Sequence, residues 1–230
     1  MKYLNEIRRE LDTLASQGEK GIGYQPSSDS YADSYNGSYF DGIHLKKNSL
    51  PASYIHENIQ VVYSSNLLRA VETAQAANLY WNVEHIIRPE LREISFGHME
   101  GMEDRDIAVK YRDFKAQQAL MEEDLPYPGG ECAGDVVRRA EPVFREMTES
   151  GYERIAVVTH GGVIRSVTAH CLGIPMNKWR ILGKNLENCS ITELNWDGAS
   201  GRFTLERFND YAHLEPYPDL LRKGWVSAEN

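Results

Sequence analysis

The arrangement of apolar and polar positions is most regular beyond residue 58. The segments IQVVYSS (59–65) and RIAVVTH (154–160) are short, nearly continuous apolar runs, a pattern typical of buried strands. Each is followed by a segment with apolar residues every three or four positions, 66–81 and 161–171, which predicts a helix. Gly173 and Pro175 are suitable residues to end the second of these helices.

A third helix is predicted over residues 134–151, because its apolar residues recur at helical spacing. The residues that share this face are Val136, Val137, Ala140, Val143, Phe144 and Met147. Further on, SITELNW (190–196), DGASG and RFTLERFN (202–209) read as strand, turn and strand. Strands that alternate with helices predict an α/β fold with a mainly parallel central sheet. Since no linker interrupts the pattern, we expect a single domain over residues 1–230.

The first 58 residues are less regular, and we treat 1–58 as a divergent N-terminal segment of that domain. Apolar residues at helical spacing from Leu4 to Leu14 predict a helix that stops near Gly18. Residues 21–42 are rich in Ser, Tyr, Asp and Gly, which favours a solvated loop.

Composition excludes several functional classes. The formal net charge of −9 argues against a general nucleic-acid binder or a protein of anionic membrane surfaces. The three cysteines include no C-x-x-C pair, so neither a disulfide framework nor a zinc site is indicated. The N-terminus carries charges throughout, unlike a signal peptide, and no apolar run approaches the ~20 residues of a membrane span. We therefore expect a cytoplasmic protein without membrane or nucleic-acid partners.

Polar residues follow two of the predicted strands. Ser65 ends the first strand, with Arg69 in the first turns of the next helix, and His160 ends the other strand, before Gly161 and Gly162. Ligands of such sheets bind where strands end and helices begin, and helix N-termini and arginine forks suit phosphate. A capping or core histidine and a surface ion pair are the alternatives for each junction taken alone.

The segment RPELREISFGHMEGMEDRD contributes carboxylates. Glu93 and Glu100 surround Phe96, Gly97 and Gly101, which indicates a loop rather than a helix face. Desolvation in a partly apolar loop would raise the pKa of a carboxyl group and suit it to act as a general acid. The alternative is a solvated run of charges.

Five segments in order, VYSSNLLRAVETA, LREISFGHMEG, PGGE, VVTHGGVIR and NCSITEL, resemble those of the histidine phosphatase superfamily, the phosphoglycerate mutase-like proteins. The resemblance runs from about Val61 to Asn209. It implies a three-layer α/β/α sandwich with a phosphate pocket at the strand ends. The short connection between EG and PGGE is more similar to the phosphatase branch than to the mutases.

The resemblance also implies roles for individual residues. Arg69 would bind the phosphoryl oxygens, Glu93 would protonate the leaving oxygen, and His160 would hydrogen-bond the phosphoryl group. We assign Ser65 and Gly161 to substrate binding beside Arg69. The expected ligand is a small phosphorylated or similarly anionic metabolite, and we expect no metal and no cofactor. The sequence makes no prediction of oligomeric state.

One family element is missing from this sequence. The superfamily uses a first histidine, in an Arg-His-Gly motif, as the covalent acceptor of the phosphoryl group, and the sequence contains no Arg-His-Gly. Where the motif is expected, near residues 21–37, the sequence has Tyr24, Gln25 and Pro26. Three explanations are open: a site that binds without turnover, an enzyme with a substitute such as His44 or direct attack by water with Glu93 as base, or a rearranged N-terminal segment.

Other hydrolase classes lack support. There is no H-x-H or H-E-x-x-H for a metal hydrolase, no G-x-S-x-G for a serine hydrolase and no P-loop. The two hypotheses are therefore a phosphomonoesterase and a non-catalytic binding module on the same fold.

Overall fold

A computed structural model describes residues 58–183 and 186–221 of the chain. The helix predicted near the N-terminus, the Ser- and Tyr-rich segment at 21–42 and His44 lie outside the described residues. The described part contains every segment on which the resemblance rests, so the predicted site can be traced in it.

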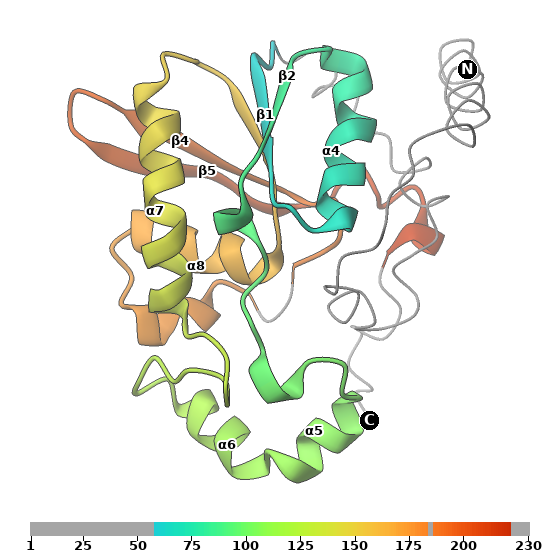
Figure 1. The fold of residues 1–230 in the computed structure, drawn as a ribbon, viewed down its shortest axis with the longest axis vertical. Coiled ribbons are helices and arrows are strands. Elements are labelled where there is room, and N and C mark those ends of the chain that lie inside the picture. Colours follow the sequence, from blue (N-terminus) through green and yellow to red (C-terminus); the bar gives the residue numbers. More distant parts are fainter. Residues whose placement is uncertain (1–57, 184–185, 222–230) are drawn as a thin grey trace.

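The sheet next to the site has three parallel strands. Strand β1 (Val61–Ser64) lies in the centre, between β2 (Glu84–Ile87) and β3 (Ile155–Val158). Ser64 is paired with Ile87 on one side and with Val158 on the other, so the three strands end level with one another. In Figure 1 these ends point toward the side of the molecule on which α5 and α6 lie. The parallel sheet is confirmed, and β2 is a strand that sequence analysis did not identify.

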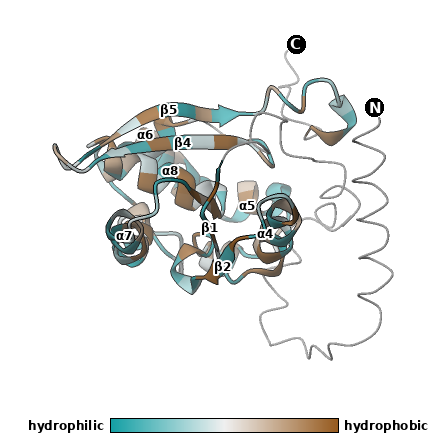
Figure 2. Cartoon of the chain, turned by 90° about the horizontal axis from the view of Figure 1, so that it is seen from above, coloured by the Kyte–Doolittle hydropathy of each residue, from teal (hydrophilic) through white to brown (hydrophobic). Residues whose placement is uncertain are grey.

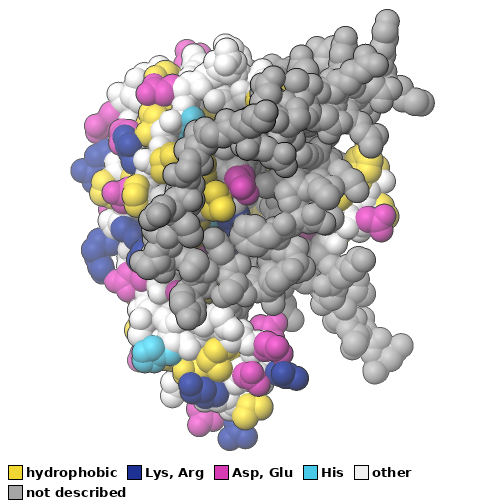
Figure 3. Space-filling model, turned by 45° about the vertical axis from the view of Figure 1, so that its right-hand side comes forward, with side chains coloured by type: hydrophobic (Ala, Val, Ile, Leu, Met, Phe, Trp, Pro, Cys, Tyr) yellow, Lys and Arg dark blue, Asp and Glu magenta, His cyan; other side chains and the backbone are white. Residues whose placement is uncertain are grey.

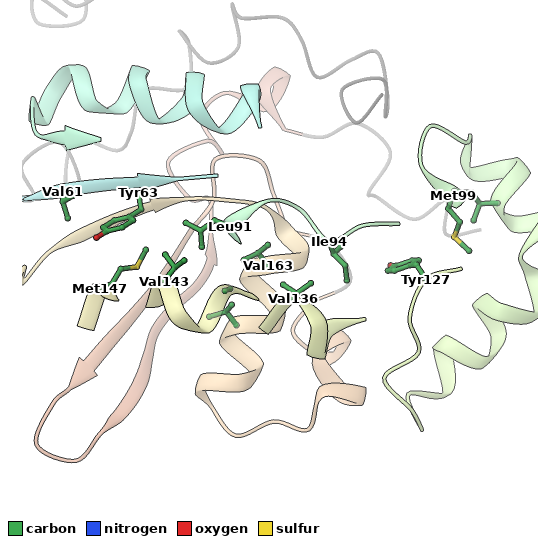
Figure 4. Close-up of a cluster of buried hydrophobic side chains, with 13 residues drawn as sticks. Val61, Tyr63, Leu91, Ile94, Met99, Tyr127, Val136, Val143, Met147 and Val163 are labelled. Atoms are coloured by element: carbon green, nitrogen blue, oxygen red, sulfur yellow. The ribbon is translucent and has the colours of Figure 1, made fainter. Parts of the chain in front are cut away.

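Helices cover both faces of the sheet. Helix α4 (Leu68–Trp81) follows β1, α7 (Ala133–Glu149) precedes β3, and α8 (Gly161–Cys171) follows it. Figure 4 shows Val61 and Tyr63 of β1 pointing toward Val143 and Met147 of α7, while α4 lies on the other side of the strand. The three-layer α/β/α arrangement is therefore confirmed.

Helix α7 follows directly from its amphipathic pattern. Five of its six predicted core residues are buried and Phe144 is partly buried against them. Burial of each such aliphatic side chain contributes about 1.5–3 kcal/mol before entropy is considered. Asp135 completes a capping box with Cys132 at the helix start, because its Oδ2 accepts the Cys132 backbone N–H at 3.1 Å. Helix α8 ends as predicted, with Gly173 at a φ of 69°.

The C-terminal strands form a separate two-stranded sheet. Strands β4 (Ile191–Asp197) and β5 (Arg202–Asp210) pair antiparallel, as the predicted strand, turn and strand require. The turn is closed by Gly201, whose N–H donates to the Asp197 carbonyl at 2.8 Å. Figure 2 shows hydrophobic and hydrophilic bands along both strands, which lie over α8 on the side away from β2.

Short helical elements occupy the region beyond the strand ends. They are η2 (Pro89–Leu91), η3 (Gly97–Met99), α5 (Asp104–Lys110), α6 (Arg112–Leu120), η4 (Met176–Ile181) and η5 (Pro218–Leu220). Tyr127 packs between α6 and the residue before η3, since its ring lies edge-on to Phe96, 4.9 Å away, and 5.8 Å from Phe114 of α6. Sequence analysis made no prediction for α5 and α6.

The described surface carries many charged side chains. Acidic and basic side chains are interspersed over the described part of the face in Figure 3. Among the described helices, none has the length and apolar character needed to cross a membrane.

Candidate active site

The ends of β1 and β3 bring Ser65 and His160 together. The Ser65 N–H donates to the Val158 carbonyl at 3.1 Å, which extends the pairing of the two strands past their last residues. Ser65 Oγ then lies 2.7 Å from His160 Nε2, and both residues are buried. On the same strand end, Thr159 Oγ1 donates to the Leu91 carbonyl at 2.7 Å. The end of β3 therefore positions two parts of the site: His160 itself and, through the Leu91 carbonyl, the segment that contains Glu93.

His160 is held in a neutral state. Burial lowers its pKa from 6.5 to about 3, and the charges of Arg69 and Arg139 add to this effect. Ser65 Oγ also accepts the Leu67 N–H at 3.3 Å, and its hydroxyl can donate to Nε2 in the tautomer of neutral imidazole that carries its proton on Nδ1. In that tautomer the ring has one N–H, on Nδ1, to offer to a ligand, and it carries no positive charge of its own.

Glu93 caps the helix that begins after His160. Its Oε1 accepts the Gly162 N–H at 3.0 Å and the Ile94 N–H at 2.8 Å. A Cβ at position 162 would lie 2.4 Å from this oxygen, so only glycine permits the contact. In the described part of the chain, the other carboxylate oxygen, Oε2, has no hydrogen-bond partner. One oxygen of Glu93 is fixed and the other is available.

The environment of Glu93 favours its protonated form. Burial raises the pKa of this carboxyl group, and the Ile94 N–H and the charges of Arg69 and Arg165 only partly oppose the rise. Arg69 is a partly buried residue in the first turn of α4. Because its charge acts on both Glu93 and His160, the structure brings together the three residues that sequence analysis singled out.

Sequence analysis also singled out Gly161 and Glu100, and their surroundings differ from those of Gly162 and Glu93. Within the part of the chain that the structure describes, a Cβ at position 161 would meet no atom within 4 Å. Glu100 is exposed, and its Oε1 accepts the Ser95 hydroxyl at 2.9 Å and the Phe96 N–H at 3.1 Å. Of the two candidate carboxylates, Glu93 lies in the site and Glu100 stabilises a surface turn.

Sequence analysis missed the pair that positions Glu93. Arg139 of α7 donates to both carboxylate oxygens of Glu131, at 2.8 and 3.0 Å, and to the backbone carbonyls of Glu93, at 3.2 Å, and Glu90. Glu131 in turn accepts the Ser95 N–H at 2.9 Å. Each of the two side chains is 17% exposed. The PGGE segment was a signal for Glu131, but no spacing indicates that Arg139 reaches across to it.

Two glycines allow the LREISFG segment to cross the PGGE segment. Gly97 has a φ of 55°, and a Cβ there would lie 2.4 Å from the Pro128 carbonyl oxygen. At Gly130 a Cβ would lie 2.3 Å from the Ser95 carbonyl oxygen. The crossing depends on both glycines, because backbone atoms cannot move aside as a flexible side chain would.

The described residues contain no group of three or more His, Cys, Asp and Glu side chains placed to hold a metal ion. Burial raises the pKa of the Cys132 and Cys171 thiols to about 11. Both are therefore protonated at neutral pH, and neither is a reactive thiolate.

A parallel sheet between two layers of helices is the arrangement of the phosphoglycerate mutase-like fold, which is the fold of histidine phosphatases. The chain belongs to this group: the family model of the histidine phosphatase superfamily (branch 1) matches residues 46–211. The fold and family predicted from the sequence motifs are thereby confirmed.

Its relatives include phosphatases. A putative phosphoserine phosphatase 2 of Hydrogenobacter thermophilus is 25% identical over 165 residues, which cover 71% of this chain and 79% of the relative. A glucosyl-3-phosphoglycerate phosphatase of Mycolicibacterium vanbaalenii is 31% identical over 62% of this chain and 68% of its own. Among solved structures, a mycobacterial glucosyl-3-phosphoglycerate phosphatase in complex with inorganic phosphate superposes with a TM-score of 0.58, at 26% identity, over 68% of this chain and 79% of that one.

Proposed function

We propose that the protein binds a small phosphomonoester between Arg69, His160 and the start of α8, and hydrolyses it. The observation that carries this proposal is the meeting of His160 and Glu93 at one helix start, where Ser65 holds the first and Gly162 the second. Relatives named for phosphoserine and glucosyl-3-phosphoglycerate support a substrate of this class.

Phosphate binding needs donors that are in place before the substrate arrives. The Arg69 guanidinium presents a planar fork to two phosphoryl oxygens, and the neutral His160 ring donates a further hydrogen bond. Gly161 has no side chain, and no other described residue lies within 4 Å of its Cβ position, so an oxygen can approach the first turn of α8, whose N–H groups favour an anion. Preorganised donors of this kind are typically worth ~3 kcal/mol each in the transition state.

Glu93 supplies the proton for the leaving group. Its Oε1 is fixed by the Gly162 and Ile94 N–H groups, so Oε2 carries the proton of the neutral acid. Burial raises the pKa of this carboxyl group, which keeps the proton in place at higher pH than an exposed glutamate could. In the reaction, the bond from phosphorus to the ester oxygen breaks and Oε2 protonates that oxygen.

Water is the nucleophile in this scheme. A bond forms between the water oxygen and phosphorus on the side opposite the leaving oxygen while the ester bond breaks, which first gives dihydrogen phosphate and the Glu93 carboxylate. The dihydrogen phosphate then loses one proton, and Glu93 regains one from solvent. The products are the free alcohol and hydrogen phosphate, and Glu93 is again protonated. Direct attack forgoes the covalent intermediate, so we expect slow turnover compared with relatives that contain Arg-His-Gly.

A second candidate function is a binding module without turnover. The absence of Arg-His-Gly from the sequence favours it, because the family's covalent acceptor is that histidine. Arg69, His160 and Glu93 would then hold a phosphorylated or other anionic ligand without reaction. Both candidate functions predict that phosphate binds, but only hydrolysis predicts that phosphate is released from an ester.

The test is phosphate release from p-nitrophenyl phosphate and from small metabolite esters by the wild type, Glu93→Gln and His160→Ala. Glu100→Gln is the matched control, since this exposed carboxylate lies outside the site. Loss of release in the first two variants, with release retained in Glu100→Gln, supports hydrolysis. Equal release by all four proteins overturns it, and binding of vanadate without release supports the binding module.

A substitute nucleophile is tested separately. Acid-labile phosphohistidine should accumulate after mixing with substrate if His44 accepts the phosphoryl group, and His44→Ala should abolish it. If hydrolysis proceeds without phosphohistidine, direct attack by water is supported.

A further inference from the structure

We propose that His85 of β2 is a positioning residue of the phosphoryl pocket, which acts through Ser64 on the turn that carries Ser65. This turn leads from β1 into α4, and it sets the places of both His160 and Arg69. The inference rests on the proposed function, because it concerns the pocket in which the phosphomonoester would bind. In this role His85 makes no contact with the substrate and acts only through its neighbours.

His85 and Ser64 lie on the same face of the parallel sheet. His85 is paired with Val62 of β1, and Ser64 stands two residues further along that strand. Tyr63, between them, points to the opposite face, toward α7 (Figure 4). His85 Nε2 lies 2.7 Å from Ser64 Oγ, and the serine is completely buried. The side chain of His85 therefore reaches from β2 to the end of the central strand.

The hydrogen atoms of this group can be assigned from its contacts. Ser64 Oγ donates to the Ser65 carbonyl at 2.9 Å, and a hydroxyl has a single proton to donate. Ser64 Oγ must therefore accept the hydrogen bond from His85, whose proton is on Nε2. Burial lowers the pKa of His85, so the ring is neutral at neutral pH and this is its one N–H. The donors then run in one direction, from His85 to Ser64 and from Ser64 to the carbonyl of Ser65.

Ser65 is held through both of its backbone polar groups. Its N–H donates to the Val158 carbonyl of β3 at 3.1 Å, and its carbonyl accepts the Ser64 hydroxyl. The side chain between these two groups points at His160, with Oγ 2.7 Å from Nε2. Because the backbone is fixed on either side, the direction of the Ser65 side chain is fixed as well. Loss of the bond from His85 would free the Ser64 hydroxyl to rotate, and Ser65 would hold His160 less firmly.

The same turn places Arg69. Ser65 Oγ accepts the Leu67 N–H at 3.3 Å. The Leu67 carbonyl then accepts the first helical N–H groups of α4, from Ala70 at 2.9 Å and from Val71 at 3.1 Å. Leu67 has no side chain that can cap the helix, so the start of α4 follows the turn before it. Arg69 lies in the first turn of that helix and moves with it.

A role in packing alone does not account for these side chains. Val61 and Val62, earlier on the same strand, are fully buried and apolar. An alanine at position 64 would continue this strand without a partner, whereas a buried hydroxyl needs hydrogen bonds. His85 supplies the second hydrogen bond of Ser64. The strand changes from apolar to polar at the end where the pocket lies, which supports a role in the pocket.

Calorimetric titration with inorganic phosphate tests the role of His85. We expect His85→Leu to bind phosphate about tenfold more weakly than the wild type, the scale of one hydrogen bond. His85→Gln should recover most of this affinity, because an amide N–H can donate to Ser64 Oγ in place of Nε2.

Ile86→Ala is the matched control for these variants. Ile86 packs against the core on the other face of β2, so its loss should lower the stability of the protein and leave the affinity for phosphate unchanged. Equal affinity of the wild type and His85→Leu, or an equal loss in His85→Leu, His85→Gln and Ile86→Ala, overturns the role of His85.

A double-mutant cycle tests the route through Ser64. If His85 acts through this hydroxyl, Ser64→Ala should weaken phosphate binding to a similar extent, and His85→Leu should weaken it little further in that variant. Two losses that simply add together would mean that His85 acts by another route, and they would overturn the proposal.

The position of His160 can also be followed without phosphate. The NMR signals of its ring nitrogens, assigned by their absence from His160→Asn, should change in His85→Leu in the same direction as in Ser65→Ala. They should stay in place in Ile86→Ala. Unchanged signals of His160 in His85→Leu overturn the inference.

These readouts separate the inference from the proposed function. If the wild type binds phosphate but releases none from esters, hydrolysis fails and the comparison of affinities still tests His85. If the wild type binds no phosphate, the proposed function fails as a whole, and the ring signals of His160 decide the role of His85.

Discussion

Glu93 Oε1 lies 3.0 Å from the backbone nitrogen of Gly162, so the proposed proton donor is also the cap of the helix that follows His160. This hydrogen bond connects two residues that lie 69 positions apart in the chain. Through this bond, the pKa of Glu93, the stability of α8 and the position of His160 depend on one another.

Gly162→Ala should destabilise the protein, because the new Cβ would lie 2.4 Å from Glu93 Oε1 and 2.5 Å from Ile94 Cγ2. Overpacking of this kind typically costs about 1–3 kcal/mol. Urea unfolding measures the change. Gly161→Ala is the matched control, since its Cβ would meet no atom of the described residues within 4 Å and the stability of this variant should change little. Equal unfolding midpoints for the two variants would contradict the close approach of Glu93.

Ser65→Ala should leave the buried His160 ring without its 2.7 Å partner. An unsatisfied buried polar group costs about 1–3 kcal/mol, and the unfolding free energy should fall by that amount. Ser200→Ala, in the exposed turn between β4 and β5, provides the comparison and should change stability by less than about 0.5 kcal/mol. No difference between the two variants would mean that Ser65 does not hold His160.

The stability of the protein should fall with acid through the titration of His160. Its pKa drops from 6.5 to about 3 on folding, so between these values the unfolded chain binds more protons than the native state. The contribution is complete above pH 6.5 and is lost progressively as the pH falls toward 3, at up to about 1.4 kcal/mol per pH unit.

The comparison with His160→Asn isolates this effect. Glu93 has a raised pKa and the opposite sign, since its contribution is complete below 4.5 and is lost as the pH rises through its folded pKa. Both proteins contain Glu93, so the difference between their unfolding free energies at several pH values reports His160. A difference that does not change between pH 4 and 7 would contradict a buried neutral histidine.

Arg139→Gln should destabilise the protein and also lower any phosphate release, because Arg139 holds Glu131 and the backbone of Glu93. Removing one partner of a largely buried ion pair costs roughly 3 kcal/mol. Arg138→Gln removes a neighbouring arginine that is 77% exposed and paired with Asp135, and should cost less than about 1 kcal/mol. Both variants are compared by urea unfolding and by phosphate release, and similar effects of the two would contradict the role given to Arg139.

The local pattern of apolar and polar residues was sufficient to predict most helices and strands of the layered fold. Strands β1 and β3, helices α4, α7 and α8 and the β4–β5 pair each carry a periodicity that extends over their own length, so each could be predicted from its own residues. Strand β2 could not, because its four residues, Glu84–Ile87, alternate only partly and owe their conformation to pairing with β1. Glu131 belonged to a quoted motif, yet its partnership with Arg139 depends on how α7 crosses the loop.

By itself, the sequence determined the family, the order of elements and the residue types at the site, since Arg69, Glu93 and His160 stand in motifs that can be read along the chain. Only the tertiary structure decided how they act together. The bond of Ser65 to His160, the capping of α8 by Glu93 and the contact of Arg139 with the Glu93 carbonyl join segments that are distant in the chain. Burial and the distances between charges set the pKa of such groups, and both quantities exist only after the chain has folded.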